Sequence, residues 1–148
     1  MATDLSRTQL EGALAALGTT CRDDTTILLG GSAALILTNA LERGTNDGWL
    51  NGSVQSYVEV LPPDYDTRVK TLRPFGRLSV SLLGRRDVIV MKFFSDRPKD
   101  LRDLEQIAPT AAELAFTARE LPRLAKIDPV KTTRMQTVLD AWPGTEAK

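Results

Sequence analysis

The sequence predicts an α+β fold in which helices flank a small mixed β-sheet and the C-terminal part is helical. Two short β-prone runs, residues 25–29 and 78–83, supply candidate strands. Capping signals and apolar residues at helical spacing dominate the last third of the chain. The length of 148 residues and the hydrophobic content of 42% suit one domain over residues 1–148. We place its core at about residues 25–107 and its C-terminal helices at residues 110–142.

The N-terminal residues 4–17 predict a helix, because four apolar side chains recur there at helical spacing. These side chains are Leu10, Ala13, Leu14 and Leu17. Thr8 and Glu11 are spaced as a capping box near its start, and Gly18 is placed to end it.

A strand followed by a glycine turn comes next. The run TTILL, residues 25–29, is short, apolar and β-prone, so it predicts a buried strand. Gly30, Gly31 and Ser32 follow at once, and residues 33–41 then favour a helix.

The middle of the chain contains a loop and two further candidate strands. Residues 44–53 are rich in glycine and asparagine and predict a loop. The run SYVEVL, residues 56–61, predicts a strand that two prolines end. Residues 78–83, LSVSLL, form the clearest half-buried strand, because apolar residues alternate there with serines.

The next two segments differ in how clearly their sequences predict a secondary structure. Residues 87–95, DVIVMKFFS, are compatible with either a strand or a helix, since a nearly continuous apolar run carries no period. Residues 98–107 predict a helix whose apolar face holds Leu101, Leu104 and Ile107.

Two C-terminal helices carry explicit start signals. Thr110 and Glu113 are spaced as a capping box before a helix that runs toward Arg123. Asp128 is an N-cap residue, and Pro129 takes the first helical position after it. The last helix then presents an apolar core stripe of Met135, Val138, Leu139 and Trp142.

The composition excludes several classes of function. The chain has no histidine, which excludes metal sites with His ligands and hydrolases that need a His general base. Its one cysteine, Cys21, allows no internal disulfide, and without a histidine to activate it we interpret it as a bystander. The polar N-terminus and the lack of an apolar run of about 18 residues predict a cytoplasmic chain without a membrane span.

The charge balance bears on nucleic-acid binding. The 19 Lys and Arg residues equal the 19 Asp and Glu residues, so the formal net charge is zero. This balance argues against strong non-specific attraction to nucleic acid, yet it leaves room for a local basic patch.

The Gly30-Gly31-Ser32 turn has two interpretations. Glycines between a strand and a helix let the backbone approach a ligand, and the free N–H groups at a helix start favour phosphate. Alternatively, the glycines only allow tight packing at the turn. The turn is neither a P-loop nor a dinucleotide-binding fingerprint, because the further glycines and the lysine of those motifs are missing.

A charged cluster in residues 91–107 also has two interpretations. Lys92 lies within an apolar run, where a charged side chain normally has a partner or a ligand. Asp100 and Asp103 are three residues apart on a predicted helix and therefore share a side. The cluster is either a salt-bridged helix pair, with Lys92 or Arg97 bound to an aspartate, or part of a functional site, and the two are compatible.

Four stretches resemble the bacterial nucleotidyltransferase-like proteins of the group that includes abortive-infection toxins. They are ILLGGSAA (27–34), RGT (43–45), DGWLN (47–51) and RRDVIVMKFFSDRPKDLRDLEQI (85–107). The last is the most specific, because the family pattern also has a lysine followed by an Arg-Pro-x-Asp-x-x-Asp run. The C-terminal helices match only loosely.

The resemblance implies a nucleotidyltransferase-type fold and a nucleotide site. By this resemblance Gly30, Gly31 and Ser32 contact the phosphates of a nucleoside triphosphate. Arg43 and Thr45 complete the nucleotide-binding set.

The resemblance also implies a catalytic set. Lys92 becomes a phosphate-neutralising or active-site lysine, and Asp100 and Asp103 hold the local architecture or border the site. In the family an Asp-x-Asp strand follows the Arg-x-Thr segment and holds Mg²⁺, for which carboxylates are the natural ligands.

That Asp-x-Asp pair is missing from its expected place. Thr45 is followed by Asn46 and then directly by the DGWLN turn. If Asp47 is taken as the first carboxylate, Trp49 falls at the second ligand position, and an indole cannot bind Mg²⁺. We therefore place Asp47 in the turn, so that a strand and a helix are absent from the sequence as written. A true deletion and a segment left out of the written sequence are the two alternatives.

Three hypotheses follow for the function. The first is transfer of a nucleotide from a metal-bound triphosphate to an RNA or protein acceptor, in a toxin–antitoxin or phage-defence setting, by a chain that is catalytically incomplete as written. The second is a non-catalytic module that binds a nucleotide or a cognate protein partner. The third is a structural or oligomerisation domain without a ligand.

Overall fold

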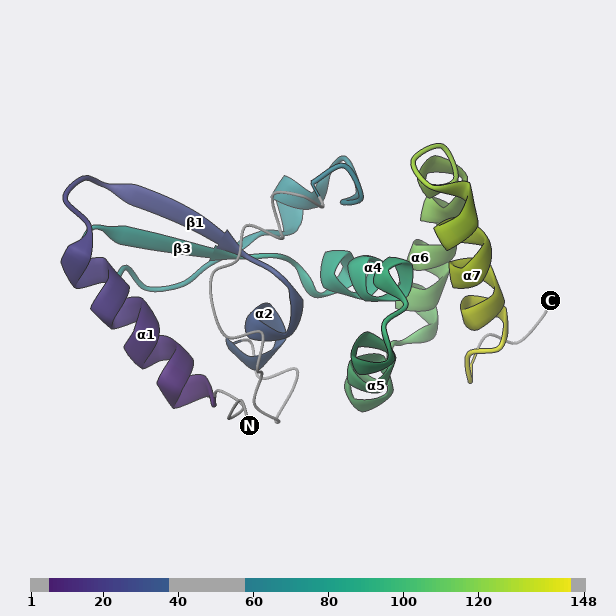
Figure 1. The fold of residues 1–148 in the computed structure, drawn as a ribbon, viewed down its shortest axis with the longest axis horizontal. Helices are drawn as coiled ribbons and strands as arrows, with labels where there is room; N and C mark the ends of the chain where they lie inside the picture. Colours follow the sequence, from purple (N-terminus) through teal and green to yellow (C-terminus); the bar gives the residue numbers. More distant parts are fainter. Residues whose placement is uncertain (1–5, 38–57, 145–148) are drawn as a thin grey trace. The chain divides into compact units, whose positions relative to one another are not determined.

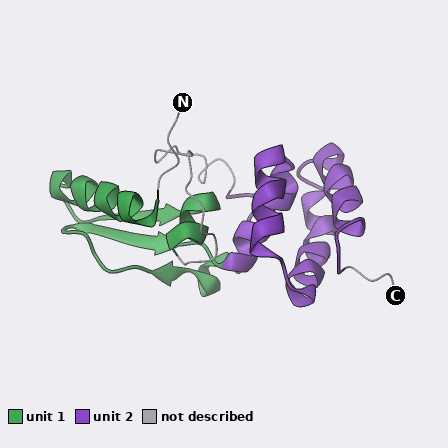
Figure 2. Cartoon of the chain, turned by 90° about the horizontal axis from the view of Figure 1, so that it is seen from below, with its two compact units in different colours: residues 1–56, 64–84 green, residues 57–63, 85–148 purple. Residues whose placement is uncertain are grey.

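The computed structural model describes residues 6–37 and 58–144 (Figure 1). Its packing divides the chain into two compact units, which Figure 2 distinguishes by colour. Unit 1 comprises residues 1–56 and 64–84, and unit 2 comprises residues 57–63 and 85–148. Because the described part combines helices with a mixed three-stranded sheet, the predicted α+β class is confirmed. The organisation as one domain stays a prediction, and each unit is described by itself.

Unit 1 contains the sheet, in the order β1-β3-β2. The strand β1 (Thr25–Leu29) runs parallel to β3 (Leu78–Leu82), and β2 (Lys70–Thr71) is antiparallel to β3. The predicted alternation in β3 is confirmed, because its leucines and its valine are buried and its serines are more exposed. Both strands expected from the β-prone runs are therefore present, but the prediction that residues 25–29 are buried is wrong, because the two threonines of β1 are exposed and its last three residues are half-buried.

The helix α1 (Arg7–Thr20) lies along the sheet in both views (Figures 1 and 2) and contacts β3. Its capping box is formed by Ser6 and Gln9, not by the predicted Thr8 and Glu11. The prediction that Gly18 ends the helix is wrong, because the helix continues to Thr20. Gly18 is instead buried at a point where the helix approaches the backbone of another segment.

The predicted strand over residues 56–61 is wrong in its described part. Residues 58–60 form a turn, with the Leu61 N–H donating to the Val58 carbonyl at 3.2 Å. The carbonyls of Glu59 and Val60 accept from the guanidinium of Arg123, at 2.8 and 2.6 Å. A side chain on a distant helix thus satisfies backbone groups that a strand would pair in a sheet.

The loop predicted over residues 44–53 lies outside the described residues, as does the end of the helix predicted over residues 33–41. The described part of that helix is α2 (Gly31–Leu37), which starts earlier than predicted. A short 3₁₀ helix, η1 (Tyr65–Arg68), precedes β2 and was not predicted.

Unit 2 is helical. It contains α4 (Arg85–Ser95), α5 (Pro98–Ile107), α6 (Ala111–Leu124) and α7 (Pro129–Asp140). The helix α4 contacts each of the other three. Its Val88, Ile89, Val90 and Phe93 have no exposed surface. Burial on all sides explains why the sequence of α4 shows no amphipathic period, and the structure decides the open alternative in favour of a helix.

The starts of α6 and α7 are confirmed. Thr110 and Glu113 form the predicted capping box of α6. Asp128 is the N-cap of α7, because its side chain accepts from the Lys131 N–H, and Pro129 follows it at the first helical position. In the predicted α7 stripe, Met135 and Leu139 are buried, while Val138 and Trp142 are half-buried.

The buried face of α5 differs from the expectation. Leu104 and Ile107 are buried as predicted, but Leu101 is only half-buried. Asp100 and Asp103 are buried on the same helix. The buried face is therefore partly charged, which an apolar periodicity cannot reveal.

No helix in residues 6–37 and 58–144 is long and apolar enough to cross a membrane.

Candidate functional site

A buried lysine marks the candidate site. Lys92 lies in the last turn of α4 and is 3% exposed. An ammonium group removed from water is strongly destabilised unless charged or polar partners surround it. The surroundings of Lys92 therefore decide whether the position is tolerable.

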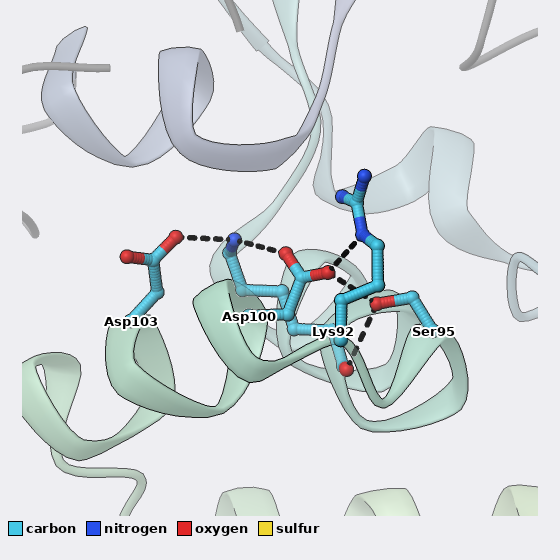
Figure 3. A network of polar contacts seen from close by, with 5 residues as sticks. Lys92, Ser95, Asp100 and Asp103 are labelled. Carbon is cyan, nitrogen blue, oxygen red and sulfur yellow. Dashed lines mark hydrogen bonds and ion pairs between the residues drawn. The ribbon is translucent and has the colours of Figure 1, made fainter. Parts of the chain in front are cut away.

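Two carboxylates of α5 supply those partners. The Lys92 Nζ donates to Asp100 Oδ1 at 3.0 Å and to Asp103 Oδ2 at 2.7 Å. Figure 3 shows the ammonium nitrogen between the two aspartates. The aspartates are 3% and 0% exposed, so both ion pairs are shielded from water. The expected salt-bridged helix pair is present, and it uses both aspartates at once.

Asp100 has two further donors. Ser95 Oγ and Arg97 Nε each donate to Asp100 Oδ2 at 2.6 Å. The Ser95 hydroxyl also lies 3.2 Å from the Lys92 carbonyl within α4, and its bond to Asp100 ties the end of α4 to the start of α5 (Figure 3). Ser95 was not predicted from the sequence, because a serine near a helix end carries no distinctive signal.

These contacts set the ionisation of Asp100. Burial acts to raise the pKa of the Asp100 carboxyl, but the hydrogen bonds from Arg97 and Ser95 and the charge of Lys92 together lower it below its ordinary value. Asp100 also lies in the first turn of α5, where a negative charge is favoured by the helix dipole.

The cluster of Lys92, Ser95, Arg97, Asp100 and Asp103 is electrically balanced. Two carboxylates face one buried ammonium and one guanidinium whose side chain is 65% exposed. A carboxylate pair that already holds an ammonium at 2.7–3.0 Å has no room there for a divalent cation as well. Within residues 6–37 and 58–144, no three acidic or cysteine side chains converge as a metal site. The place after Thr45 where the resemblance puts the Mg²⁺ ligands lies outside the described residues.

The Gly30-Gly31-Ser32 turn belongs to unit 1. Gly31 has a φ of +61°, a conformation that favours glycine, and a Cβ placed on it would meet no described atom within 4 Å. Ser32 is 1% exposed. Arg43 and Thr45, the other predicted nucleotide-binding residues, lie outside the described residues. The turn and the lysine cluster are in different units, and each is described separately.

A second, partly buried charge pair joins three helices of unit 2. The Arg85 Nε donates to Glu113 Oε1 at 2.7 Å, and the Arg85 Nη2 donates to the Ile107 carbonyl at 2.7 Å. Burial acts to raise the pKa of Glu113, but the Arg85 hydrogen bond and the Thr110 N–H lower it below its ordinary value. Glu113 thus serves both the capping box and this ion pair, which the sequence analysis did not foresee.

Acid is expected to destabilise unit 2. The pKa values of Asp100 and Glu113 are lowered from 3.8 and 4.5 in the folded chain. Their contribution to stability is therefore complete above those values and is lost as the pH falls through the lower folded-state values. The melting temperature should hold between pH 7 and about 5 and fall below about 4.

Replacing Asp100 by asparagine should make this acid decline shallower in thermal unfolding measured over the same pH range. Glu105→Gln is the matched control, because Glu105 is exposed on the same helix and makes no ion pair in the described part. An equally steep decline in Asp100→Asn would contradict the assignment.

The fold and the site define a small α+β protein with a buried lysine–aspartate cluster between two helices. Residues 49–112 match the model of a family described as nucleotidyltransferase of unknown function (DUF6036). The matched residues include all of α4 and α5, hence Lys92, Asp100 and Asp103, but not the Gly30-Gly31-Ser32 turn. The chain is therefore similar to nucleotidyltransferases over this stretch. Comparison with curated proteins and with solved structures gave no match.

Proposed function

We propose that the chain is a nucleotide-binding protein of the nucleotidyltransferase type and that its ligand is a nucleoside triphosphate. The observation that carries the proposal is the lysine–aspartate cluster, whose elements lie wholly within the residues that match the nucleotidyltransferase family. A balanced buried cluster of this kind needs both helices in one arrangement, so it fixes the position of α4 against α5.

Within this proposal, Gly30, Gly31 and Ser32 contact the triphosphate. The left-handed Gly31 and the open space around its Cα support a close approach of a ligand to the backbone. Arg43 and Thr45 complete the nucleotide-binding set, as the resemblance implies.

The resemblance makes Lys92 the phosphate-neutralising lysine, but its buried ammonium is already neutralised by Asp100 and Asp103, so in this proposal it orders α4 against α5 and is not a phosphate contact. Asp100 and Asp103 are positioning residues, because they hold the ammonium at one place through two directed ion pairs. A lysine so held keeps its charge at a defined position, which a freely rotating surface lysine does not.

A second candidate function is nucleotidyl transfer itself, to an RNA or protein acceptor, in a toxin–antitoxin or phage-defence setting. The observation that favours it is the description of the matching family as nucleotidyltransferases. Such transfer calls for Mg²⁺, which neutralises the triphosphate and aligns the attacking oxygen. The Asp-x-Asp ligands of Mg²⁺ are missing from their expected place after Thr45 in the sequence, so we rank nucleotide binding without catalysis first.

Thermal unfolding with a nucleoside triphosphate tests the proposal. A ligand present at 100 times its Kd stabilises the folded state by about 2.7 kcal/mol. For a chain of this size, that corresponds to a rise in Tm of about 5–10 °C. Binding without catalysis predicts the rise in Tm both with and without Mg²⁺. Transfer predicts a rise in Tm that requires Mg²⁺, and it also predicts that label moves from the nucleotide to an acceptor.

Gly31→Ala should weaken triphosphate binding, measured as Kd by titration calorimetry, because alanine disfavours the left-handed turn. Gly144→Ala is the matched control, since Gly144 also has a positive φ and open space but lies beyond α7. Its Kd should equal that of the unchanged protein. The proposal would be overturned if none of the four common nucleoside triphosphates stabilised the protein, with or without Mg²⁺.

A further inference from the structure

Two exposed arginines of unit 2 converge on one aromatic ring. Arg86 in the first turn of α4 and Arg119 in α6 place their guanidinium carbons 5.5 and 5.7 Å from the centroid of Phe116. Phe116 is 9% exposed, so its ring is a fixed support rather than a mobile surface group. The two guanidinium carbons are no more than about 11 Å apart, the sum of these two distances.

Among residues 6–37 and 58–144, neither arginine is paired with a carboxylate. The residues three and four positions away from Arg86 on both sides are leucine, isoleucine and valine. Those around Arg119 are alanine, phenylalanine, proline and arginine. In the part of the chain that the structure describes, neither guanidinium forms a salt bridge.

The two carboxylates of α6 nearest to Arg119 along the chain are already engaged. Glu113 is bound by Arg85, and Glu120 is bound by Arg123. The Arg123 guanidinium also donates to two backbone carbonyls, so it serves the structure of unit 2. Two like charges of Arg86 and Arg119 thus share one ring without local compensation, an arrangement that an anion would stabilise.

We propose that Arg86 and Arg119 form a binding site for the phosphates of a single-stranded nucleic acid, for which single-stranded RNA is the probe. A guanidinium binds phosphate through two parallel N–H···O bonds. A ring beneath the guanidinium restricts the arginine side chain in advance, so less conformational entropy is lost on binding. A single strand presents phosphates at short intervals along a flexible backbone, so two of them can adapt to two fixed guanidiniums.

The surface around the pair fits nucleic acid better than an acidic protein. Protein interfaces depend on an apolar centre, whereas nucleic-acid interfaces are polar and positive. The large hydrophobic residues exposed in the described part are Val58, Ile127 and Val130, and none of them lies on α4 or α6. The zero net charge of the chain makes a local pair of this kind the feature that attracts RNA.

The site does not depend on nucleotide binding or transfer, because it uses neither the glycine turn nor Lys92. The test is fluorescence anisotropy of a labelled single-stranded RNA oligonucleotide, titrated with the full chain at several salt concentrations. The variants are Arg86→Gln, Arg119→Gln and their combination. Arg102→Gln is the matched control, because Arg102 is an exposed arginine of α5 in the same unit.

Each substitution in the pair is expected to weaken RNA binding by about tenfold. This loss corresponds to the lower end of the free energies that hydrogen bonds to charged groups contribute. The double variant should also reduce the slope of log K against log salt by about 1.4, because two phosphate contacts are lost. All three variants should keep the Tm of the unchanged protein, since both side chains are exposed. Arg102→Gln should change neither affinity nor slope.

Three outcomes would overturn the proposal. The first is no binding of RNA by the unchanged protein at about 50 mM salt, where phosphate contacts are strong. The second is equal loss of affinity in Arg102→Gln and in the pair variants. The third is binding of a polyglutamate peptide, but not of RNA, through the same two arginines, which would make the site a protein-docking surface.

Discussion

Replacing Lys92 by methionine is expected to lower the free energy of unfolding by about 3–5 kcal/mol. Methionine fills a similar volume, so the loss comes from charge and not from a cavity. Asp100 and Asp103, which are 3% and 0% exposed, would lose the ammonium that both of them bind. Buried carboxylates without their cation must take up a proton or draw in water, and either response costs stability.

Urea unfolding followed by circular dichroism measures this loss. Lys126→Met is the matched control, because Lys126 is an exposed lysine of the same unit, and its change should stay within about 0.5 kcal/mol. The triple variant Lys92→Met, Asp100→Asn and Asp103→Leu should recover much of the loss, since no charge remains buried. A loss below about 1 kcal/mol in Lys92→Met would mean that the ammonium is not held between the two aspartates.

The substitution Gly18→Ala is expected to destabilise the chain by about 1–3 kcal/mol. A Cβ at Gly18 would lie 2.1 Å from the carbonyl oxygen of Phe75, far inside van der Waals contact. The obstacle is backbone, and the adjacent Gly76 has a positive φ of 59° that fixes the turn. The helix α1 must therefore shift away from this turn, and apolar packing between them is lost.

Gly12→Ala provides a control on the same helix. Gly12 is exposed in α1, and a Cβ there would meet nothing within 4 Å. Alanine is a better helix former than glycine, so this variant should gain about 0.5–1 kcal/mol. Urea unfolding of the two variants should thus give changes of opposite sign. Stabilisation by both substitutions would show that α1 does not approach the Phe75 backbone so closely.

The lysine–aspartate cluster was largely predictable from the sequence. A lysine inside an apolar run demands partners, and two aspartates three residues apart on the next helix are placed to provide them. The sequence left open whether Lys92 or Arg97 would bind them. The packing of α4 on α5 decided that Lys92 binds both, while Arg97 and Ser95 bind Asp100.

The arginine contacts could not be found in the sequence. Arg86 and Arg119 are 33 positions apart, and only the packing of α4 against α6 brings them to one ring. Arg123 reaches the carbonyls of Glu59 and Val60 across more than 60 residues. Long side chains have no periodic signature, because their reach exceeds the spacing of neighbouring helical turns.

What the sequence determined by itself is local: the α+β class, the strands β1 and β3, and the starts of α6 and α7. Capping residues and alternation act over a few positions, so they are legible without knowledge of the fold. Tertiary structure alone decided that α4 is a helix, that residues 58–60 form a turn and that Gly18 is a point of close approach. In each of these places a segment distant in sequence determines which residues are buried or pairs with the backbone polar groups. The free energy of these tertiary contacts outweighs the weak local preference of a few residues.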